Sequence, residues 1–207
     1  MVEVSSEPGE WSVMGRVIVS NLMTLDGHLA GPGGDVMVLP FEDNDSFSTH
    51  NLGLLLDAET LLLGATTYIG MRDYWPPVKD DESQPEVERA ISRRNDEIAK
   101  VVVSDSLTSD DTDPWRETTT IVPRKEAHDT IAKLRRGGTD VVTFGSVTLV
   151  NDLLAAGLVD ELQFLVGGGV LLEGVPAFSQ RPARALHLVE ARKIRGTNTA
   201  LLRYSLQ

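Results

Sequence analysis

The alternation of short, β-rich apolar runs with segments of helical pattern constrains the fold of this chain most. Strands are expected at residues 17–19, 60–63, 101–103, 119–122, 141–144 and 161–166, and helices at 46–56, 83–99, 126–136 and 147–156. Such alternation predicts a mostly parallel sheet with helices on both faces. Two final strands, 186–194 and 199–205, are separated by Arg195-Gly196-Thr197-Asn198, which predicts an antiparallel hairpin.

Local signals indicate where several of these helices begin and end. Asp45 or Ser46 is a suitable N-cap for the first helix, and Ser83-Gln84-Pro85-Glu86 fits a capping box with a proline in the first turn. Gly137-Gly138 and Gly157 predict the ends of the helices that precede them.

The length of 207 residues fits one domain with a well-filled core. We expect residues 1–14 to be a loose N-terminal tail and residues 15–207 to form a single domain. The tail lacks the apolar segment of a signal peptide, and no apolar run is long enough to span a bilayer. There is no cysteine, so the cytoplasm is the expected compartment, without contact with a membrane.

Charge and motif content disfavour several classes of function. The net charge of −12 disfavours a nucleic-acid partner, because such a partner requires a basic surface. The four histidines lack metal-ligand spacing, so no metal site is expected. A Gly-x-Ser-x-Gly motif is absent, which disfavours a serine hydrolase.

One sequence pattern occurs twice: a strand, then glycine with Ser or Thr, then the start of a helix. The first example is Gly64-Ala65-Thr66-Thr67 and the second is Gly145-Ser146. Glycine allows a ligand to approach the backbone, and a helix N-terminus offers free N–H groups and a partial positive charge. Either glycine alone is more simply a turn residue. Two such sites on one edge of the sheet favour a ligand with several phosphates.

Two other segments leave alternatives open. Gly167-Gly168-Gly169 follows a strand, but it does not match a dinucleotide or phosphate-loop fingerprint and is equally typical of an irregular strand end. Asp26, in Thr24-Leu25-Asp26-Gly27-His28, either orients or protonates a substrate or belongs to an Asp-Gly turn, and local sequence favours the turn.

Residues 16 to about 204 resemble the reductase (C-terminal) domain of the bifunctional riboflavin-biosynthesis enzyme RibD and its free-standing, dihydrofolate-reductase-like relatives. The matching segments, in order, are residues 20–27 (SNLMTLDG), 61–68 (LLLGATTY), 74–76 (YWP), 100–107 (KVVVSDSL), 144–146 (FGS) and 157–162 (GLVDEL). The last is the most specific, because it joins a helix end to the next strand start.

The resemblance implies a three-layer α/β/α dihydrofolate-reductase-like fold and a nicotinamide cofactor. It implies hydride transfer to a small heterocyclic substrate, as in 5-amino-6-(5-phosphoribosylamino)uracil reductase, and a homodimer. Asp26 would lie beside the substrate. The implied cofactor-binding residues are Gly64, Ala65, Thr66, Thr67, Ser104, Asp105, Gly145, Ser146, Val147, Gly168 and Gly169.

The chain departs from the family pattern at three places. Ala65 and Asp105 stand where the family commonly has basic residues, which weakens the case for a cofactor 2′-phosphate. We therefore expect NADPH to be only slightly preferred, with NADH possible. Residues 168–174 replace the usual Pro-Val-x-Leu-Gly, which reshapes the substrate site and leaves the substrate undefined. A zinc-deaminase motif is absent, so the deaminase half of the riboflavin enzyme is not expected here.

Two other functions remain as alternatives. A ligand-binding protein on the same scaffold, without catalysis, fits the missing basic residues. A dihydrofolate reductase is less favoured, because the segment after the first strand has the riboflavin-type Leu-Asp-Gly.

Overall fold

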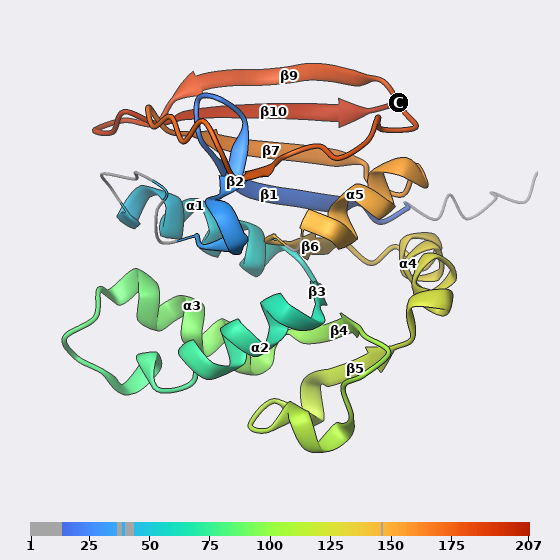
Figure 1. The fold of residues 1–207 in the computed structure, drawn as a ribbon. Helices are drawn as coiled ribbons and strands as arrows, with labels where there is room; N and C mark the ends of the chain where they lie inside the picture. Colours follow the sequence, from blue (N-terminus) through green and yellow to red (C-terminus); the bar gives the residue numbers. More distant parts are fainter. Residues whose placement is uncertain (1–13, 37–38, 40–43, 146) are drawn as a thin grey trace, which may run out of the picture.

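An eight-stranded sheet forms the centre of the molecule (Figure 1). The computed structural model describes residues 14–36, 39, 44–145 and 147–207. The strand order is β5-β4-β3-β6-β1-β7-β10-β9. Neighbours from β5 to β7 are parallel, whereas β10 is antiparallel to both β7 and β9, as predicted. The bounds are β1 (Val17–Met23), β3 (Thr60–Gly64), β4 (Ala99–Val103), β5 (Thr119–Val122), β6 (Val141–Thr143), β7 (Glu161–Val166), β9 (Leu186–Lys193) and β10 (Ala200–Leu206).

A second, two-stranded sheet lies outside the sequence-based prediction. It pairs β2 (His28–Ala30) with β8 (Val175–Pro176) in antiparallel fashion. Both strands are too short to show a period of two, so their sequences carry no strand signal. The pair joins the chain after β1 to the chain after β7.

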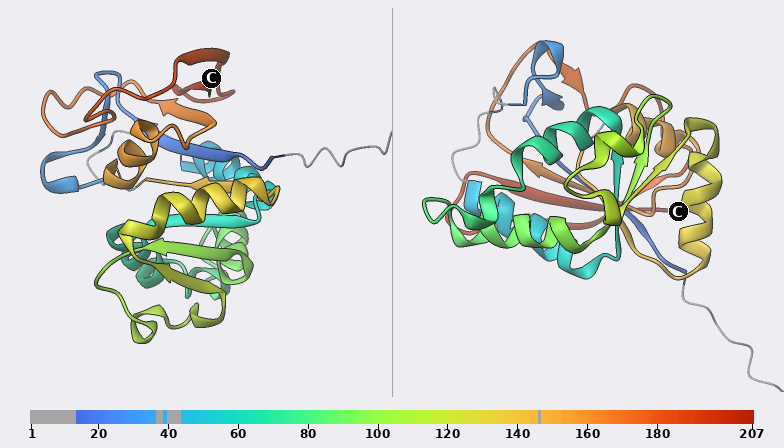
Figure 2. Two further views of the ribbon diagram at one scale, coloured as in Figure 1. Left: turned by 90° about the vertical axis from the view of Figure 1, so that its right-hand side faces the viewer. Right: turned by 90° about the horizontal axis from the view of Figure 1, so that it is seen from below.

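In the part of the chain that the structure describes, five α-helices cover the two faces of the large sheet (Figure 2). They are α1 (Asn44–Asp57), α2 (Ala65–Tyr74), α3 (Glu86–Glu97), α4 (Ala127–Arg136) and α5 (Val147–Ala155). Short 3-10 turns are formed by Pro32–Gly34, Val78–Asp80, Ser109–Thr112, Arg116–Thr118 and Arg124–Glu126. Among the described residues, no helix combines the length and apolar content needed to cross a lipid bilayer.

The core consists of two clusters, one on each face of the sheet. Leu61 and Leu63 are fully buried against residues of α1, α2 and α3, whereas Leu62 points to the cluster that contains residues of α4 and α5. This alternation follows from the period of two in a strand buried on both faces. The three-layer α/β/α fold is thereby confirmed.

The helix ends correct two predictions and confirm two others. Asp45 and Ser46 are not N-caps, because α1 already begins at Asn44. The capping box is also wrong: Pro85 is the N-cap of α3, and the Ser83 hydroxyl instead donates to Asp81 Oδ1 at 2.6 Å. Gly137 caps α4, and the chain after α5 turns at Gly157 with φ 68°, as predicted.

The position of β6 between β3 and β1 creates a topological switch point, where the connections that leave neighbouring parallel strands run to opposite faces of the sheet. Parallel pairing joins Thr60 to Val141 and Leu61 to Val142. From β3 the chain continues through α2 and α3 on one face, and from β6 it continues through α5 on the other. Two divergent connections of this kind leave an open crevice at the carboxyl edge of the strands. The two glycine-containing turns lie side by side there.

Lys100, in β4, is almost fully buried, with 1% of its surface exposed. Its Nζ donates to the Ile98 carbonyl at 2.9 Å and to Thr118 Oγ1 at 3.0 Å, and it lies 4.7 Å from the centre of the Trp115 ring. Burial lowers the pKa of Lys100 to about 8. Folding therefore releases a proton from this lysine between about pH 8 and its ordinary pKa of 10.5.

We predict that Lys100 makes the free energy of unfolding rise with pH across this interval, because only the unfolded chain stays protonated there. The contribution should reach about 2 kcal/mol. Urea unfolding of the wild type and Lys100→Met at pH 7.5 and 10 should give a stability difference that changes by this amount in favour of the wild type. Parallel pH profiles would contradict the assignment.

Candidate active site

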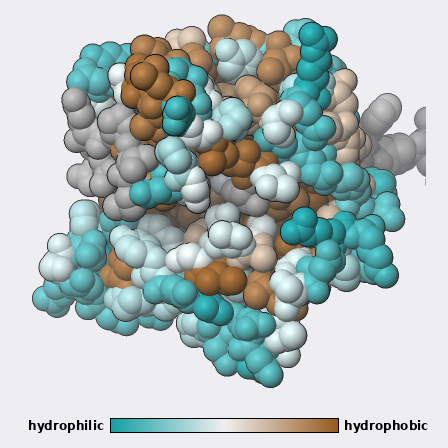
Figure 3. Space-filling model, viewed as in Figure 1, coloured by the Kyte–Doolittle hydropathy of each residue, from teal (hydrophilic) through white to brown (hydrophobic). Residues whose placement is uncertain are grey.

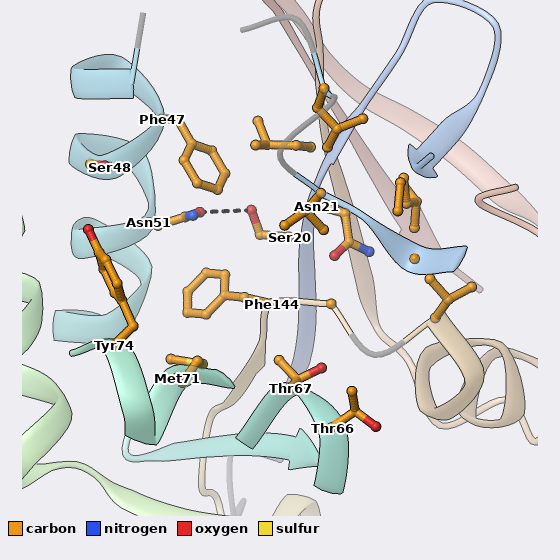
Figure 4. Close-up of a pocket in the computed structure, with 18 of the residues that line it drawn as sticks. Ser20, Asn21, Phe47, Ser48, Asn51, Thr66, Thr67, Met71, Tyr74 and Phe144 are labelled. Carbon is orange, nitrogen blue, oxygen red and sulfur yellow. Dashed lines mark hydrogen bonds between the residues drawn. The ribbon is translucent and has the colours of Figure 1, made fainter. Parts of the chain in front are cut away.

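A cavity of about 820 Å³ opens at the crevice beside β3 and β6. Residues of β1, α1, α2 and α3 line it, together with the turn that follows β6 and residues of β2 and β8. Figure 4 shows Phe47 and Asn51 on α1 facing Thr67 and Met71 on α2, with Phe144 between them. A cavity of this size can bury a small-molecule ligand.

The N-termini of α2 and α5 both contribute to the cavity. Thr66 and Thr67, in the first turn of α2, line it, as do Val147 and Thr148 at the start of α5. The N-cap of α2 is Gly64, which makes no side-chain capping bond. The first N–H groups of α2 therefore remain available to an anion.

Gly145 joins β6 to α5 in a conformation that suits glycine. Its φ is +86°, and no heavy atom lies within 4 Å of the position that a Cβ would take. Gly145 also lines the cavity, so its backbone is open to a ligand. The predicted partner Ser146 lies outside the described residues.

The wall formed by β1 and α1 is polar. The Ser20 hydroxyl donates to Asn51 Oδ1 at 3.1 Å (Figure 4), and the Ser48 hydroxyl donates to Glu88 of α3. Asn21 is 94% buried, and its Nδ2 has no hydrogen-bond partner among the described residues. A buried donor without a partner is costly, but this nitrogen has almost no exposed surface, so a ligand would reach it only if the side chain moved.

The rest of the lining is largely apolar and aromatic. It includes Phe47, Met71, Tyr74, Trp75 and Phe144. Figure 3 views the molecule as in Figure 1 and shows hydrophobic side chains at the centre and upper part of this face, with hydrophilic ones around its lower margin. Aromatic walls with a few polar groups are typical of sites for flat organic ligands.

Asp26 lies outside the set of residues that line the cavity. Its carboxylate accepts hydrogen bonds from the Thr24 hydroxyl at 2.6 Å and from the N–H groups of Leu171 and Leu172 at 3.1 and 2.8 Å. These bonds, with Thr24 the largest cause, hold the pKa of Asp26 well below its ordinary value. An ionised carboxylate is a poor proton donor, so this geometry favours the turn interpretation. The predicted contact with substrate stays a prediction.

Ser104 and Asp105 follow β4 at the same edge of the sheet but also lie outside the cavity lining. Ser104 Oγ accepts hydrogen bonds from the N–H groups of Ser106 and Leu107 at 3.1 and 3.0 Å. Asp105 accepts one from Arg124 N at 2.9 Å, and its Oδ2 lies 3.5 Å from Arg124 Nε. Both side chains are thus used in local turns, and their contact with cofactor stays a prediction.

The other predicted glycines are dispersed. Gly64 ends β3 and Ala65 begins α2, immediately before the two threonines of the cavity. Gly169 accepts a hydrogen bond from Leu25 N at 2.8 Å, so Gly168 and Gly169 lie beside the Asp26 turn and outside the cavity lining. Their roles in cofactor binding also stay predictions.

Several residues that line the cavity were not predicted from the sequence. Asn21 and Phe144 fall within segments that resemble the riboflavin reductases, but no motif distinguishes them. Asn51 and Glu88 lie inside helices whose periodic pattern gives no sign of chemistry. The fold brings these side chains to one place, where β1, α1 and α3 line the same cavity.

We predict that Asp26 holds the glycine-rich segment after β7 in place. Asp26→Asn should accelerate amide hydrogen exchange at Leu171 and Leu172 by on the order of tenfold, because a charged acceptor is replaced by a neutral one. Exchange measured by NMR would test this, with Asp105→Asn, which accepts from Arg124 N, as the matched control. Unchanged exchange at Leu171 and Leu172 would refute the role.

Comparison with known proteins places the chain in a family. Its sequence is 24% identical over 164 residues to the uncharacterised protein YyaP of Bacillus subtilis (strain 168), covering 79% of this chain and 80% of that protein.

Three solved structures share the fold. A protein named for riboflavin biosynthesis from Shewanella sp. PV-4 has a TM-score of 0.70 at 18% identity, covering 93% of this chain and 99% of that one. A Thermotoga maritima diaminohydroxyphosphoribosylaminopyrimidine deaminase/5-amino-6-(5-phosphoribosylamino)uracil reductase has a TM-score of 0.60 at 12% identity, covering 94% of this chain and 57% of that one. Dihydrofolate reductase from Enterococcus faecalis, described in complex with NADP(H), has a TM-score of 0.57 at 14% identity, covering 94% and 98%.

The model of the RibD C-terminal domain matches residues 16–200, nearly the whole chain. The chain therefore belongs to the RibD C-terminal domain family, the reductase type of the riboflavin pathway.

Proposed function

We propose that this protein is a nicotinamide-dependent reductase that reduces a small heterocyclic substrate in the cavity beside β3 and β6. One observation carries the proposal: two helix N-termini that follow adjacent parallel strands open into the same cavity. Their N–H groups and dipoles suit the pyrophosphate of a dinucleotide. Membership of a reductase family supports the same chemistry.

The residues at this edge fit such a cofactor. Thr66 and Thr67 offer hydroxyls beside the free N–H groups of α2. Gly145 provides a backbone without a Cβ where the second phosphate would approach. The Enterococcus relative, described with NADP(H), shares this fold and supports the proposal.

A bound reduced nicotinamide would supply the hydride. The chain's own residues bind the two reactants, orient them and exclude water. Phe144 lies between α1 and the start of α2 and forms an apolar floor, and Glu88 offers an acceptor to a substrate N–H group. Because Asp26 remains ionised at neutral pH, its proposed part is to position residues 170–172.

We also propose that the protein is a cytoplasmic homodimer, as the family resemblance implies. In support, β9 is an edge strand with Leu188 and Val189 more than half exposed. A second copy would cover this apolar edge.

Gly145→Asp should weaken NADPH binding at least about tenfold, or ~1.4 kcal/mol, because it adds a side chain and a negative charge beside the phosphates. Gly196→Asp is a matched control: Gly196 also has a positive φ, 82°, with open space around it, but it lies in the β9–β10 hairpin. Calorimetry should show weaker binding in the first variant only. Equal affinities with both variants folded would overturn the phosphate site.

Cofactor choice gives a second test. Ala65 and Asp105 offer no cation to a 2′-phosphate, and Asp105 is bound to Arg124. We therefore expect dissociation constants for NADPH and NADH within about tenfold of each other, and Asp105→Arg should increase the preference for NADPH. A thousandfold preference for NADPH in the wild type would reveal a phosphate site elsewhere. If the protein oxidises neither NADPH nor NADH with any heterocycle tested, the alternative of a non-catalytic binding protein would be favoured.

A further inference from the structure

The charge of the described cavity lining has one sign, and it is negative. Glu88 is the one charged side chain among the described residues that line it. The segments outside the description, 1–13, 37–38, 40–43 and 146, contain no lysine, arginine or histidine. Every basic side chain of the protein is therefore placed, and none of them lines the cavity.

The arginines on the helices around the cavity are engaged elsewhere. Arg72 of α2 donates to Asp73 and to the Asp111 carbonyl, and Arg89 of α3 donates to Glu86. Arg94 donates to carbonyl groups at and after the end of α1, at 2.9 and 2.8 Å. A phosphate in the cavity would have no arginine or lysine to pair with.

Helix N-termini do not replace these cations on the substrate side. Those of α2 and α5 serve the cofactor pyrophosphate in the proposed function. By contrast, Glu86 and Glu88 lie in the first turn of α3. Carboxylates at these positions already complement the positive end of this helix and would repel a second anion.

The remaining groups define what the cavity can recognise. Glu88, which accepts from the Ser48 hydroxyl, offers an anionic acceptor. Phe47 and Phe144 provide aromatic surfaces. A flat ring with an N–H or amino group satisfies both.

We infer that the substrate of this enzyme is a planar, non-phosphorylated heterocycle, neutral or positively charged, whose N–H group meets Glu88. The inference rests on the proposed function, since it assigns the helix N-termini of α2 and α5 to the cofactor. It separates this chain from the Thermotoga relative, which is named for a phosphoribosyl substrate. A phosphate dianion here would lose its hydration in a cavity whose described lining carries a carboxylate charge and no cation.

The test compares two probes by calorimetry on the protein saturated with an oxidised nicotinamide cofactor, which would occupy the helix N-termini of α2 and α5: 5-amino-6-(5-phosphoribosylamino)uracil and the same compound without its phosphate. The wild type should bind the dephosphorylated probe at least about tenfold more tightly. Glu88→Lys should shift this ratio towards the phosphorylated probe by a similar factor, because it places a cation in the cavity.

Glu97→Lys is the matched control. It lies on the same helix, changes the net charge equally and is not among the lining residues. It should leave the ratio unchanged, and Glu88→Gln, which keeps an acceptor for Ser48, provides a second variant if Glu88→Lys does not fold.

Equal or tighter binding of the phosphorylated probe overturns the inference, and so does failure of both probes to bind. An equal shift of the ratio in Glu97→Lys would also overturn it, because the effect would then reflect net charge. Separate titrations with NADPH and NADH test the proposed function. If neither cofactor binds, that function fails. If a cofactor binds and the phosphorylated probe still binds equally or more tightly, the function stands and the inference fails.

Discussion

The parallel pairing of β3 with β6 is the constraint on which the rest of the site depends. The pairs Thr60–Val141 and Leu61–Val142 bring together two strands that β4 and β5 separate in the chain. Because the connections after these strands diverge to opposite faces, neither fills the crevice between them. The crevice receives two helix N-termini at once, and α1 supplies the wall opposite.

Much of this fold could be predicted from the sequence, because the signals that determine it are local. The run at residues 60–63 is apolar at consecutive positions, as expected for a strand buried on both faces, and Gly137 and Gly157 end helices by backbone geometry alone. The strands β2 and β8 could not be predicted, since two or three residues form a strand only when a partner is present. The start of α3 was misplaced because Asp81 binds Ser83.

The residues of the candidate site also fall into two groups, those with a local sequence signal and those without one. Thr67 and Gly145 were identifiable because a glycine turn before a helix has its chemistry in contiguous residues. Asn21 and Glu88 were not, because their proximity arises from the packing of three elements distant in the chain. Resemblance to a family indicated Ser104 and Asp105, but position in a motif does not determine what a side chain contacts, and theirs contact the adjacent turns.

An acidic chain can bind a dinucleotide only if the attraction for phosphate is local. Backbone N–H groups at the starts of α2 and α5 meet this condition, because they act at contact distance and carry no net charge. Among the described residues that line the cavity there is no cation and Glu88 is the one charged side chain, so it makes the field negative where the substrate would bind. One crevice can thus bind the phosphates of the cofactor at the helix N-termini and exclude a phosphate from the substrate region. The two regions can be close together because a backbone N–H group acts only at contact distance.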